Sequence, residues 1–283
     1  MRLLVLGETG QLARALIRRA PPGVTVIACG RRVADLAQPE ACAAVVAATD
    51  ADAVINAAAW TDVDRAEAQE AAATVVNAAA PAAMARAAAA RGLPFLHVST
   101  DYVFDGAGVA PFAPGDPTGP LQAYGRSKLA GETGVRAAEG RHLILRCSWT
   151  FSADGANFVT RLLRAGQGCR SLRVVADQIG GPTPAASLAD ALIVAAQALR
   201  DGAAGGTHHL AGAPDISRAE FAQAILAGAG LACRIEPIAT QDHPTPARRP
   251  LNSRLDCRGF AAAFGVPQPD WRPALAGIVQ ALA

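Results

Sequence analysis

Short hydrophobic runs alternate with longer segments of helical period in the first half of the chain. The runs are apolar at nearly every position, as in parallel strands that helices cover on both faces. The expected strands are residues 3–6, 24–29, 53–57, 94–99 and 142–148. The expected helices are residues 11–19, 39–48, 66–91 and 125–138. This pattern predicts an α/β fold with a doubly wound parallel sheet, whose ligand binds at the carboxyl ends of the strands.

The rhythm becomes irregular after residue 148. Expected strands at 172–176 and 207–210 are mixed there with expected helices at 158–165, 188–199 and 218–227. We therefore expect two domains, with the parallel sheet in residues 1–147 and a smaller mixed α/β lobe in residues 148–283. We also expect the segments near 172–176 and 207–211 to return to the first sheet.

Composition excludes several classes of protein. The chain has 283 residues, of which 51% are hydrophobic and 18% charged, so it is too apolar to be disordered. The mean hydropathy of +0.21 hints at a membrane, but it reflects an unusually high alanine content. The longest small-residue tract, 78–90, contains Pro81, Met84 and Arg86, whereas a membrane span needs about 20 apolar residues. Residues 1–7 predict a strand too short for a signal-peptide core. We expect no membrane contact and a cytoplasmic location.

Charge and cysteine spacing argue against two further kinds of partner. The formal net charge is +2, and the Lys and Arg residues are dispersed, so we expect no binding to nucleic acid. The six cysteines are far apart and include no C-x-x-C pair. This spacing predicts reduced thiols in a cytoplasmic protein and offers no set of metal ligands.

The first strand is joined to the first helix by Gly7-Glu8-Thr9-Gly10-Gln11-Leu12-Ala13. A dinucleotide pyrophosphate needs backbone without obstructing side chains at this junction, and amide groups at a helix N-terminus that bind its charge. The two glycines meet the first need, and Ala13 replaces the third glycine of such loops. The same spacing also occurs in ordinary strand-to-helix turns. Its place in an alternating chain predicts a dinucleotide-binding domain, with Gly7, Gly10, Gln11 and Leu12 at the cofactor.

The second strand ends in Cys29-Gly30-Arg31-Arg32. An NAD-preferring site has a carboxylate there, which binds the ribose 2′-hydroxyl and would repel a 2′-phosphate. Guanidinium groups can instead pair with a 2′-phosphate. We therefore predict a preference for NADPH, with Arg31 and Arg32 as the contacts. The alternative is that both arginines are solvated loop charges.

A phenol and an ammonium group are four residues apart in Tyr124-Gly125-Arg126-Ser127-Lys128, which places them on one helical face. The ordinary pKa of tyrosine is about 10, and a neighbouring ammonium group stabilises the phenolate. We expect Lys128 to lower the pKa of Tyr124 toward the working range of a proton-transfer group. The fourth strand ends nearby, and the Thr100 hydroxyl could bind a substrate carbonyl beside Tyr124. Ser99 is the alternative donor, although neighbours along a strand face opposite sides.

Together these residues resemble the extended short-chain dehydrogenase/reductases and, within them, the dTDP-4-dehydrorhamnose reductase family. The resemblance covers nearly the whole chain, and the tyrosine motif alone defines only the superfamily. The narrower motifs are Ser99-Thr100-Asp101-Tyr102-Val103-Phe104, Asp177-Gln178-Ile179-Gly180-Gly181-Pro182-Thr183 and Arg249-Pro250-Leu251-Asn252-Ser253-Arg254-Leu255.

The resemblance implies a Rossmann-type domain and an NADPH-dependent oxidoreductase, with NADH as the alternative reductant. It implies reduction of the C4 keto group of a nucleotide 6-deoxy-4-keto sugar, dTDP-4-dehydro-L-rhamnose, to dTDP-L-rhamnose for surface polysaccharide synthesis. In this reaction Tyr124 protonates the C4 oxygen. Lys128 holds the nicotinamide ribose, and Thr100 orients the carbonyl.

The resemblance also implies contacts with both ligands. On the cofactor side, Asp35 and Leu36 flank the adenine, and Ala57, Ala58 and Ala59 line the dinucleotide at the third strand end. On the substrate side, Thr100, Asp101 and Trp149 contact the sugar.

Three other features receive weaker assignments. Arg254 lies in a segment rich in Pro and Arg, and we expect it near the diphosphate, which needs cations outside the cofactor loop. Some family members bind Mg²⁺ through acidic residues, but Asp62, Asp64 and Glu67 are equally typical of a solvated turn, so no metal site is placed. A homodimer is compatible with the sequence.

Three other functions of this fold were weighed. A nucleotide-sugar 4,6-dehydratase has an Asp-Glu step after the threonine, whereas Asp101 is followed here by Tyr102. An epimerase uses the same Tyr and Lys and differs in releasing no oxidised cofactor. A non-catalytic NADP-binding regulatory subunit, like the methionine adenosyltransferase β-type subunit, would not need Thr100, Tyr124 and Lys128 to be intact.

Overall fold

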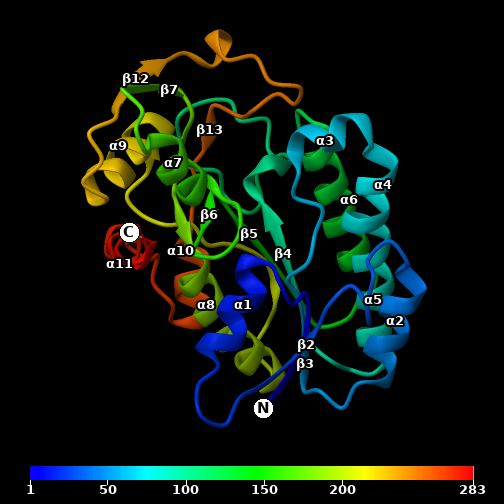
Figure 1. Cartoon of the computed structure of the whole chain (residues 1–283). Helices are drawn as coiled ribbons and strands as arrows, with labels where there is room; N and C mark the ends of the chain where they lie inside the picture. The colour runs from blue at the N-terminus through cyan, green and yellow to red at the C-terminus, as the bar shows by residue number, and fades with distance from the viewer. Residues whose placement is uncertain (283) are drawn as a thin grey trace.

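The computed structural model describes residues 1–282 and is organised around one parallel sheet with helices on both faces (Figure 1). The sheet has six strands in the order β10-β5-β4-β3-β1-β2, and each adjacent pair is parallel. The strands are β1 Arg2–Leu6, β2 Thr25–Cys29, β3 Ala53–Asn56, β4 Phe95–Thr100, β5 His142–Cys147 and β10 Gly206–His209. This arrangement confirms the predicted fold class.

Both faces of the sheet are apolar, because its strands are apolar at nearly every position and successive residues point to opposite sides. Along β1, Leu3 and Val5 pack into one hydrophobic cluster, and Leu4 and Leu6 into the other. The first cluster lies under α1 (Gln11–Arg19), α8 (Ala185–Arg200) and α10 (Arg258–Phe264). The second lies under α2 (Pro39–Ala48) and α5 (Ala80–Ala90), with α6 (Ala123–Ala137) beside them.

The alanine-rich stretch expected as one helix over 66–91 is divided into four parts. These are α3 (Val63–Ala68), α4 (Glu70–Thr74), the π-helical turn η1 (Val75–Ala79) and α5. The π-turn contains Asn77, whose side chain is buried. Asn77 Oδ1 accepts from the Trp60 amide at 2.8 Å, and Asn77 Nδ2 donates to the Trp60 carbonyl oxygen at 3.1 Å. The last three parts follow one another without a gap, so a helix from residue 70 to residue 90 covers much of 66–91 as predicted, and its π-helical turn places Asn77 in this tertiary contact.

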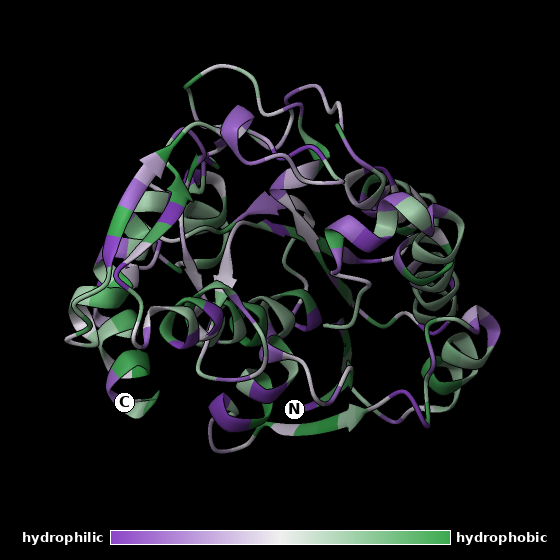
Figure 2. Cartoon of the chain, turned by 45° about the horizontal axis from the view of Figure 1, so that its top comes forward, coloured by the Kyte–Doolittle hydropathy of each residue, from purple (hydrophilic) through white to green (hydrophobic). Residues whose placement is uncertain are grey.

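The second half forms a lobe with its own hydrophobic cluster. Its helices are α7 (Phe158–Gly166), α9 (Arg218–Gly228) and α11 (Trp271–Leu282), and they enclose a cluster that includes Phe221 and Trp271. Strands β7 (Ser171–Val175) and β12 (Arg234–Ile238) form a separate parallel pair. Figure 2 shows hydrophobic and hydrophilic residues intermixed along this pair, as expected for strands covered on one face.

One of the two segments expected to return to the large sheet does so. Strand β10, within 207–211, pairs with β5 after α8 has carried the chain back across the sheet face. The expectation for 172–176 was wrong: this segment is β7, whose Leu172 and Val174 pack with the lobe cluster. The division of domains at residue 147 stays a prediction.

Short strands connect the lobe to the strand ends of the large sheet. One three-stranded sheet joins β11 (Ile216–Ser217), β8 (Ile179–Gly180) and β13 (Asn252–Ser253). Another joins β6 (Thr150–Phe151) to β9 (Thr183–Pro184). Two single turns, η2 (Asp101–Val103) and η3 (Thr240–Asp242), complete the described elements. Segments far apart in sequence, such as 179–180 and 252–253, thus lie side by side.

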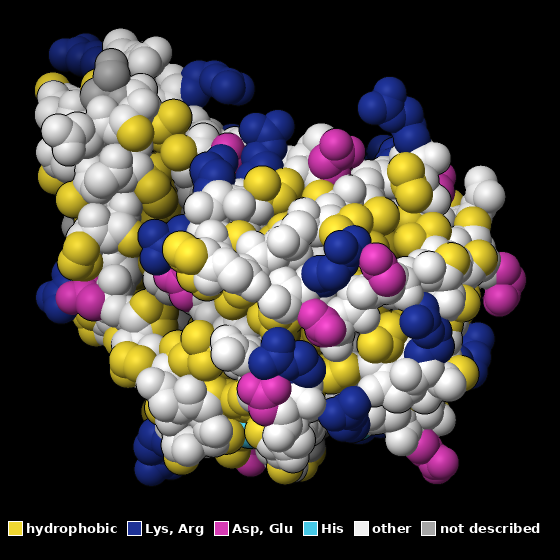
Figure 3. Space-filling view, turned by 90° about the horizontal axis from the view of Figure 1, so that it is seen from below, with side chains coloured by type: hydrophobic (Ala, Val, Ile, Leu, Met, Phe, Trp, Pro, Cys, Tyr) yellow, Lys and Arg dark blue, Asp and Glu magenta, His cyan; other side chains and the backbone are white. Residues whose placement is uncertain are grey.

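The surface seen from below carries mixed charges. In Figure 3, Arg side chains are dispersed among acidic and hydrophobic ones on this face. Within residues 1–282, no helix is both long enough and apolar enough to cross a membrane.

Candidate functional site

The three predicted catalytic residues meet where β4 ends and α6 begins. Thr100 is the last residue of β4, and Tyr124 and Lys128 occupy the first two turns of α6. The Thr100 side chain is close enough to the Tyr124 phenol to influence its pKa. Helix α6 can approach this closely because residue 125 is glycine, and a Cβ there would overlap the backbone oxygen of Tyr102. The close approach brings the hydroxyl and the phenol together.

The pKa of Tyr124 is shifted in the direction opposite to the expectation. Burial raises it above the ordinary value of 10, and Cys147 raises it further, while the nearby Thr100 side chain opposes the rise. Lys128 is not among the groups that change it. The prediction that Lys128 lowers this pKa was wrong for the chain itself, because desolvation is the largest cause of the shift and raises the pKa. Tyr124 therefore keeps its proton at neutral pH, which suits a proton donor.

Lys128 is buried in a polar chain that joins three elements. Its side chain is 2% exposed, and Nζ donates to the Val98 carbonyl oxygen (2.7 Å) and lies 3.3 Å from His97 Nε2. His97 Nδ1 lies 3.2 Å from Asn56 Nδ2, and the Asn56 oxygen accepts from the Ala58 amide. His97 therefore lies between Asn56 and Lys128 and joins them in one chain of polar contacts.

The surroundings of Lys128 lower its pKa. Burial lowers the pKa from 10.5 to about 8, and the negative charge of Glu132 limits the fall. Burial and the charge of Lys128 also lower the pKa of His97 well below its ordinary value, so the imidazole is neutral. At neutral pH Lys128 is therefore mostly an ammonium group held at a fixed position.

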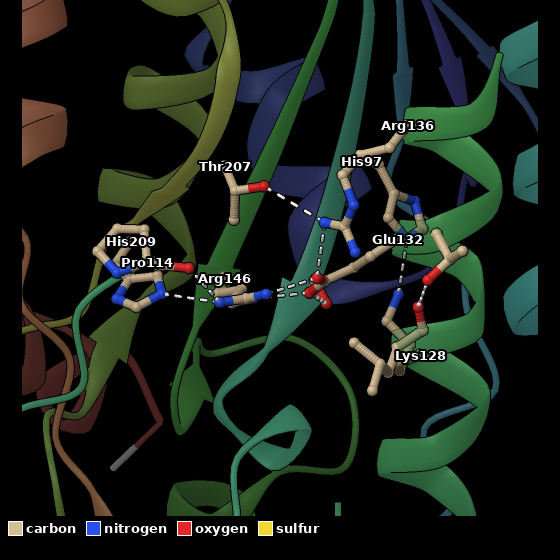
Figure 4. A network of polar contacts seen from close by, with 11 residues as sticks. His97, Pro114, Lys128, Glu132, Arg136, Arg146, Thr207 and His209 are labelled. Carbon is tan, nitrogen blue, oxygen red and sulfur yellow. Dashed lines mark hydrogen bonds and ion pairs between the residues drawn. The ribbon is translucent and has the colours of Figure 1, made fainter. Parts of the chain in front are cut away.

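A buried ion pair holds α6 against β4 and β5 (Figure 4). Glu132, one helical turn beyond Lys128, is 0% exposed and accepts from Arg146 Nε (2.8 Å) and Nη2 (2.7 Å). Ser99 Oγ donates to the same carboxylate at 2.6 Å. Ser99 thus faces away from Thr100, as strand alternation requires, and serves the network rather than the reacting groups. Burial would raise the pKa of Glu132, but Arg146 holds it below its ordinary value.

Asn77 supports the same helix from the other side, and the sequence analysis did not identify it. Its amide nitrogen donates to Ser127 Oγ at 3.0 Å, and Ser127 is the residue before Lys128. The available signal was weak: a lone Asn within an alanine-rich helical stretch, where asparagine is an unfavourable residue.

Asp101 presents a buried carboxylate oxygen without a partner. The residue is 3% exposed, and Oδ1 accepts from Thr100 Oγ1 at 3.1 Å. Within residues 1–282, Oδ2 has no hydrogen-bond partner. Burial raises the pKa of Asp101 to about 6, and the neighbouring Ser253 and Thr100 side chains limit the rise. A buried acceptor left open beside Thr100 fits a ligand hydroxyl group.

Trp149 and Arg218 form the wall of the site contributed by the lobe. The Arg218 guanidinium carbon lies 3.6 Å from the centre of the Trp149 ring, within cation–π distance. Trp149 has φ of 48°, a left-handed conformation that a bulky residue adopts at a cost. Burial lowers the pKa of Arg218 to about 10, while Tyr102 and Asp101 favour its charged form. The indole predicted as a sugar contact is therefore stacked on a cation that faces Asp101.

The sequence analysis also missed Arg218. It is the first residue of α9, after the capping box formed by Ser217 and Glu220. A cation at the positive end of a helix dipole is unfavourable, so an Arg at this position is a signal of another role.

A cavity of about 610 Å³ opens between the loop that follows η2 and the segments 239–241 and 248–251. Its walls include residues 105–107, Leu121, Arg248 and Arg249.

Arg249 is bound by both Asp64 oxygens at 2.8 Å, so its charge is largely balanced. Arg254, predicted near the diphosphate, donates to Asn252 Oδ1 (3.1 Å) and lies 3.9 Å from Asp215. Its contact with substrate stays a prediction.

The cofactor loop forms an open cradle at the carboxyl ends of β1 and β3. Gly7 has φ of 122°, and a Cβ there would lie 3.5 Å from Ala13 Cβ and from the Ala57 backbone. Gly10 begins α1 in an extended conformation without a side-chain cap, and a Cβ there would meet nothing within 4 Å. Open amide groups at a helix N-terminus beside a glycine cradle fit a dinucleotide pyrophosphate.

The other predicted cofactor residues lie along the same edge. Gln11 Oε1 accepts from Ser152 of the lobe at 2.9 Å. The Leu12 side chain packs in the first hydrophobic cluster, so only the backbone of Leu12 is available to the cradle. Ala57, Ala58 and Ala59 follow β3 directly and are partly exposed.

The turn after β2 forms the part of this sheet edge where we predict the adenine to bind. Arg31 and Arg32 are exposed there. Asp35 Oδ1 accepts from the Ala37 amide at 3.0 Å, and the Leu36 side chain is buried in the second cluster.

The acidic residues weighed for a metal are engaged within the chain. Asp62 caps α3, Asp64 binds Arg249, and Glu67 accepts from the first amide of α6 at 2.8 Å. Across residues 1–282, no group of three or more His, Cys, Asp or Glu side chains is arranged to hold a metal ion.

Comparison with known proteins gives consistent matches over the whole chain. The family model described as RmlD substrate binding domain matches residues 1–283. A dTDP-4-dehydrorhamnose reductase of Sinorhizobium fredii is 40% identical over 100% of this chain and 98% of its own length. One of Burkholderia thailandensis is 43% identical over 97% of each chain.

Solved structures agree with these matches. The dTDP-4-dehydrorhamnose reductase of Clostridium acetobutylicum superimposes with a TM-score of 0.93 at 32% identity, covering 100% of this chain and 99% of that one. The enzyme of Bacillus anthracis, solved in complex with NADP, superimposes with a TM-score of 0.91 at 29% identity and 99% coverage of both chains.

Proposed function

The chain belongs to the family described as RmlD substrate binding domain, and we propose that it reduces the C4 keto group of dTDP-4-dehydro-L-rhamnose to give dTDP-L-rhamnose. This is the activity of a dTDP-4-dehydrorhamnose reductase, an NAD(P)H-dependent oxidoreductase of rhamnose precursor synthesis. The observation that carries the proposal is that the end of β4, with Thr100, packs against the first turns of α6, with Tyr124 and Lys128, next to an open glycine cradle.

The residues divide the work of a carbonyl reduction. When bound, the nicotinamide supplies a hydride to C4 of the sugar. Tyr124, whose buried phenol keeps its proton, gives that proton to the C4 oxygen as negative charge develops on it. Thr100 orients the same oxygen through its hydroxyl group. Lys128, fixed by the Val98 carbonyl, contributes a positive charge behind Tyr124 and a donor for the nicotinamide ribose.

The substrate side is proposed to be formed by residues of both halves. The unpartnered Asp101 oxygen accepts a sugar hydroxyl group, and the Trp149 ring, stacked on Arg218, covers the sugar. Arg218 and Arg254 supply positive charge for the diphosphate, and the neighbouring cavity has room for the nucleoside. A diphosphate requires such cations because burying its charge unpaired is costly.

The cofactor is a nicotinamide dinucleotide, since a relative of the same family binds NADP. We propose NADPH as the preferred reductant, with Arg31 and Arg32 as the contacts for its 2′-phosphate; NADH is the alternative. We also propose a cytoplasmic location, because all six cysteines are free thiols.

The test is a turnover measurement with purified chain, dTDP-4-dehydro-L-rhamnose and NADPH. We expect one NADPH to be oxidised for each dTDP-L-rhamnose formed. An epimerase would convert the sugar without net oxidation of the cofactor, and a regulatory subunit would bind NADPH without turnover. Either of these two results would refute the proposal.

A further inference from the structure

The cofactor loop carries an acidic side chain to the end of β2. Glu8 directly follows Gly7, and the Gly7 amide donates to the Cys29 carbonyl oxygen at 2.8 Å. This backbone contact continues the pairing of β1 with β2 by one residue, so residue 8 is held next to residues 29 and 30. The carboxylate is close enough to Cys29 to raise the pKa of its thiol, although burial is the larger cause.

Because Gly30 has no side chain, the Glu8 carboxylate occupies the space that a side chain at position 30 would fill. An ideal Cβ on Gly30 would overlap Glu8 Oε2, and would lie 3.2 Å from Glu8 Cδ and 3.3 Å from Glu8 Cβ. The space at position 30 is therefore filled by the carboxylate of residue 8. A residue larger than glycine at position 30 and Glu8 in this conformation exclude each other.

This position has a known chemical task in dinucleotide-binding folds. A carboxylate at the end of the second strand accepts hydrogen bonds from the adenosine ribose hydroxyls, and its charge disfavours a 2′-phosphate. The sequence lacks an acid on this strand end, which is why NADPH was predicted. In three dimensions the acid is nevertheless present, supplied by the loop after β1.

The opposing charges are not paired with one another. Glu8, Arg31 and Arg32 are all exposed. Among the ion pairs formed by residues 1–282, none includes any of these three side chains. Each of them is therefore available to a ligand, and a 2′-phosphate at this edge would meet one carboxylate and two guanidinium groups.

We propose that Glu8 is a cofactor-specificity residue that replaces the missing acid at position 30. Its carboxylate binds the ribose diol of NADH and repels the 2′-phosphate of NADPH, so it opposes Arg31 and Arg32 and keeps both cofactors usable. The inference rests on the proposed function only in requiring a bound nicotinamide dinucleotide.

The test measures dinucleotide binding rather than turnover. Dissociation constants for NADPH and NADH, and for 2′-phospho-ADP-ribose and ADP-ribose, are measured by calorimetry for the parent chain and for Glu8→Gln. Glu8→Gln keeps the size of the side chain and removes its charge. We expect it to increase the preference for the 2′-phosphorylated member of each pair about tenfold at low ionic strength, and less at high salt. Glu40→Gln, an exposed acid on α2, is the matched control and should leave both ratios unchanged.

A second variant tests the exchange of positions directly. Glu8→Ala should also increase the preference for 2′-phosphorylated ligands. Adding Gly30→Asp to it should reverse that gain, because the new carboxylate enters the space that Glu8 leaves. The proposal is overturned if both Glu8 variants bind the ligands with the parent ratio. It is overturned together with the proposed function if the parent chain binds no dinucleotide.

Discussion

At the residue scale, burial sets the chemistry of the site more than neighbouring charge does. Burial is the largest cause of the raised pKa of Tyr124, of the lowered pKa of Lys128 and of the raised pKa of Asp101. The identities of Tyr124 and Lys128 could be predicted from their spacing on one helical face. The direction of the Tyr124 shift could not, because spacing carries no information about desolvation.

Replacing the phenol tests its role as proton donor. Tyr124→Phe removes the hydroxyl group and keeps the ring, so we expect kcat to fall by about 100-fold or more, the usual contribution of general acid catalysis. The affinity for NADPH, measured by calorimetry, should stay close to that of the parent. The chain has two tyrosines, and Tyr102→Phe is the matched control, with a much smaller expected loss of kcat. Equal losses in the two variants would contradict the assignment.

The lowered pKa of Lys128 can be measured directly, because it is the only lysine in the chain. Isotopic labelling of lysine should give a single NMR signal that titrates with a midpoint near pH 8 instead of 10.5. A midpoint near 10.5 would show that the ammonium group is not desolvated.

The same shift has a consequence for stability. Between pH 8 and 10.5 the unfolded chain binds the proton that the folded chain has lost, so the free energy of unfolding of the parent should rise with pH there. The rise is on the order of 3 kcal/mol, since one pKa unit corresponds to about 1.4 kcal/mol. In Lys128→Met this contribution to the pH dependence should be absent, as measured by denaturant unfolding across that range.

At the element scale, most helices and strands could be predicted, because the spacing of apolar residues within each segment matches the helix or strand that the segment forms. Helix α1 and helix α2 lie where the pattern placed them, at Gln11–Arg19 and Pro39–Ala48. The departures from this pattern have tertiary causes. The π-helical turn in the alanine-rich helix directs Asn77 to Trp60 and Ser127, and β7 pairs with β12, more than fifty residues away in sequence. Neither partner can be identified from local pattern.

Helix α6 depends on a buried ion pair, which predicts a large and specific loss of stability. Glu132→Gln leaves the Arg146 guanidinium buried without a counter-charge, so we expect a loss of about 3–5 kcal/mol in the free energy of unfolding. Arg136→Gln removes the other, exposed partner of the same carboxylate and should cost less than about 1 kcal/mol. Denaturant unfolding of both variants checks the difference, and similar losses would contradict it.

At the scale of the whole molecule, the site is a junction between two structural layers. The large sheet presents the cofactor cradle and Thr100, while the lobe brings Trp149 and Arg218 to the same edge through short strands. The sequence could identify the fold, and it could predict a cofactor loop and reacting groups, since each depends on local motifs. It could not identify Arg218 or the position of the Glu8 carboxylate, because both depend on which segments meet in space.

The central claim is that a hydride reaches C4 of the keto sugar at this junction. The most direct test is turnover of dTDP-4-dehydro-L-rhamnose with NADPH whose transferable hydrogen is deuterium, followed by NMR of the product. We expect dTDP-L-rhamnose with one deuterium at C4, formed about 100-fold more slowly or slower still by Tyr124→Phe. Oxidation of the cofactor without deuterium at C4, or binding of NADPH without any product, would contradict the claim.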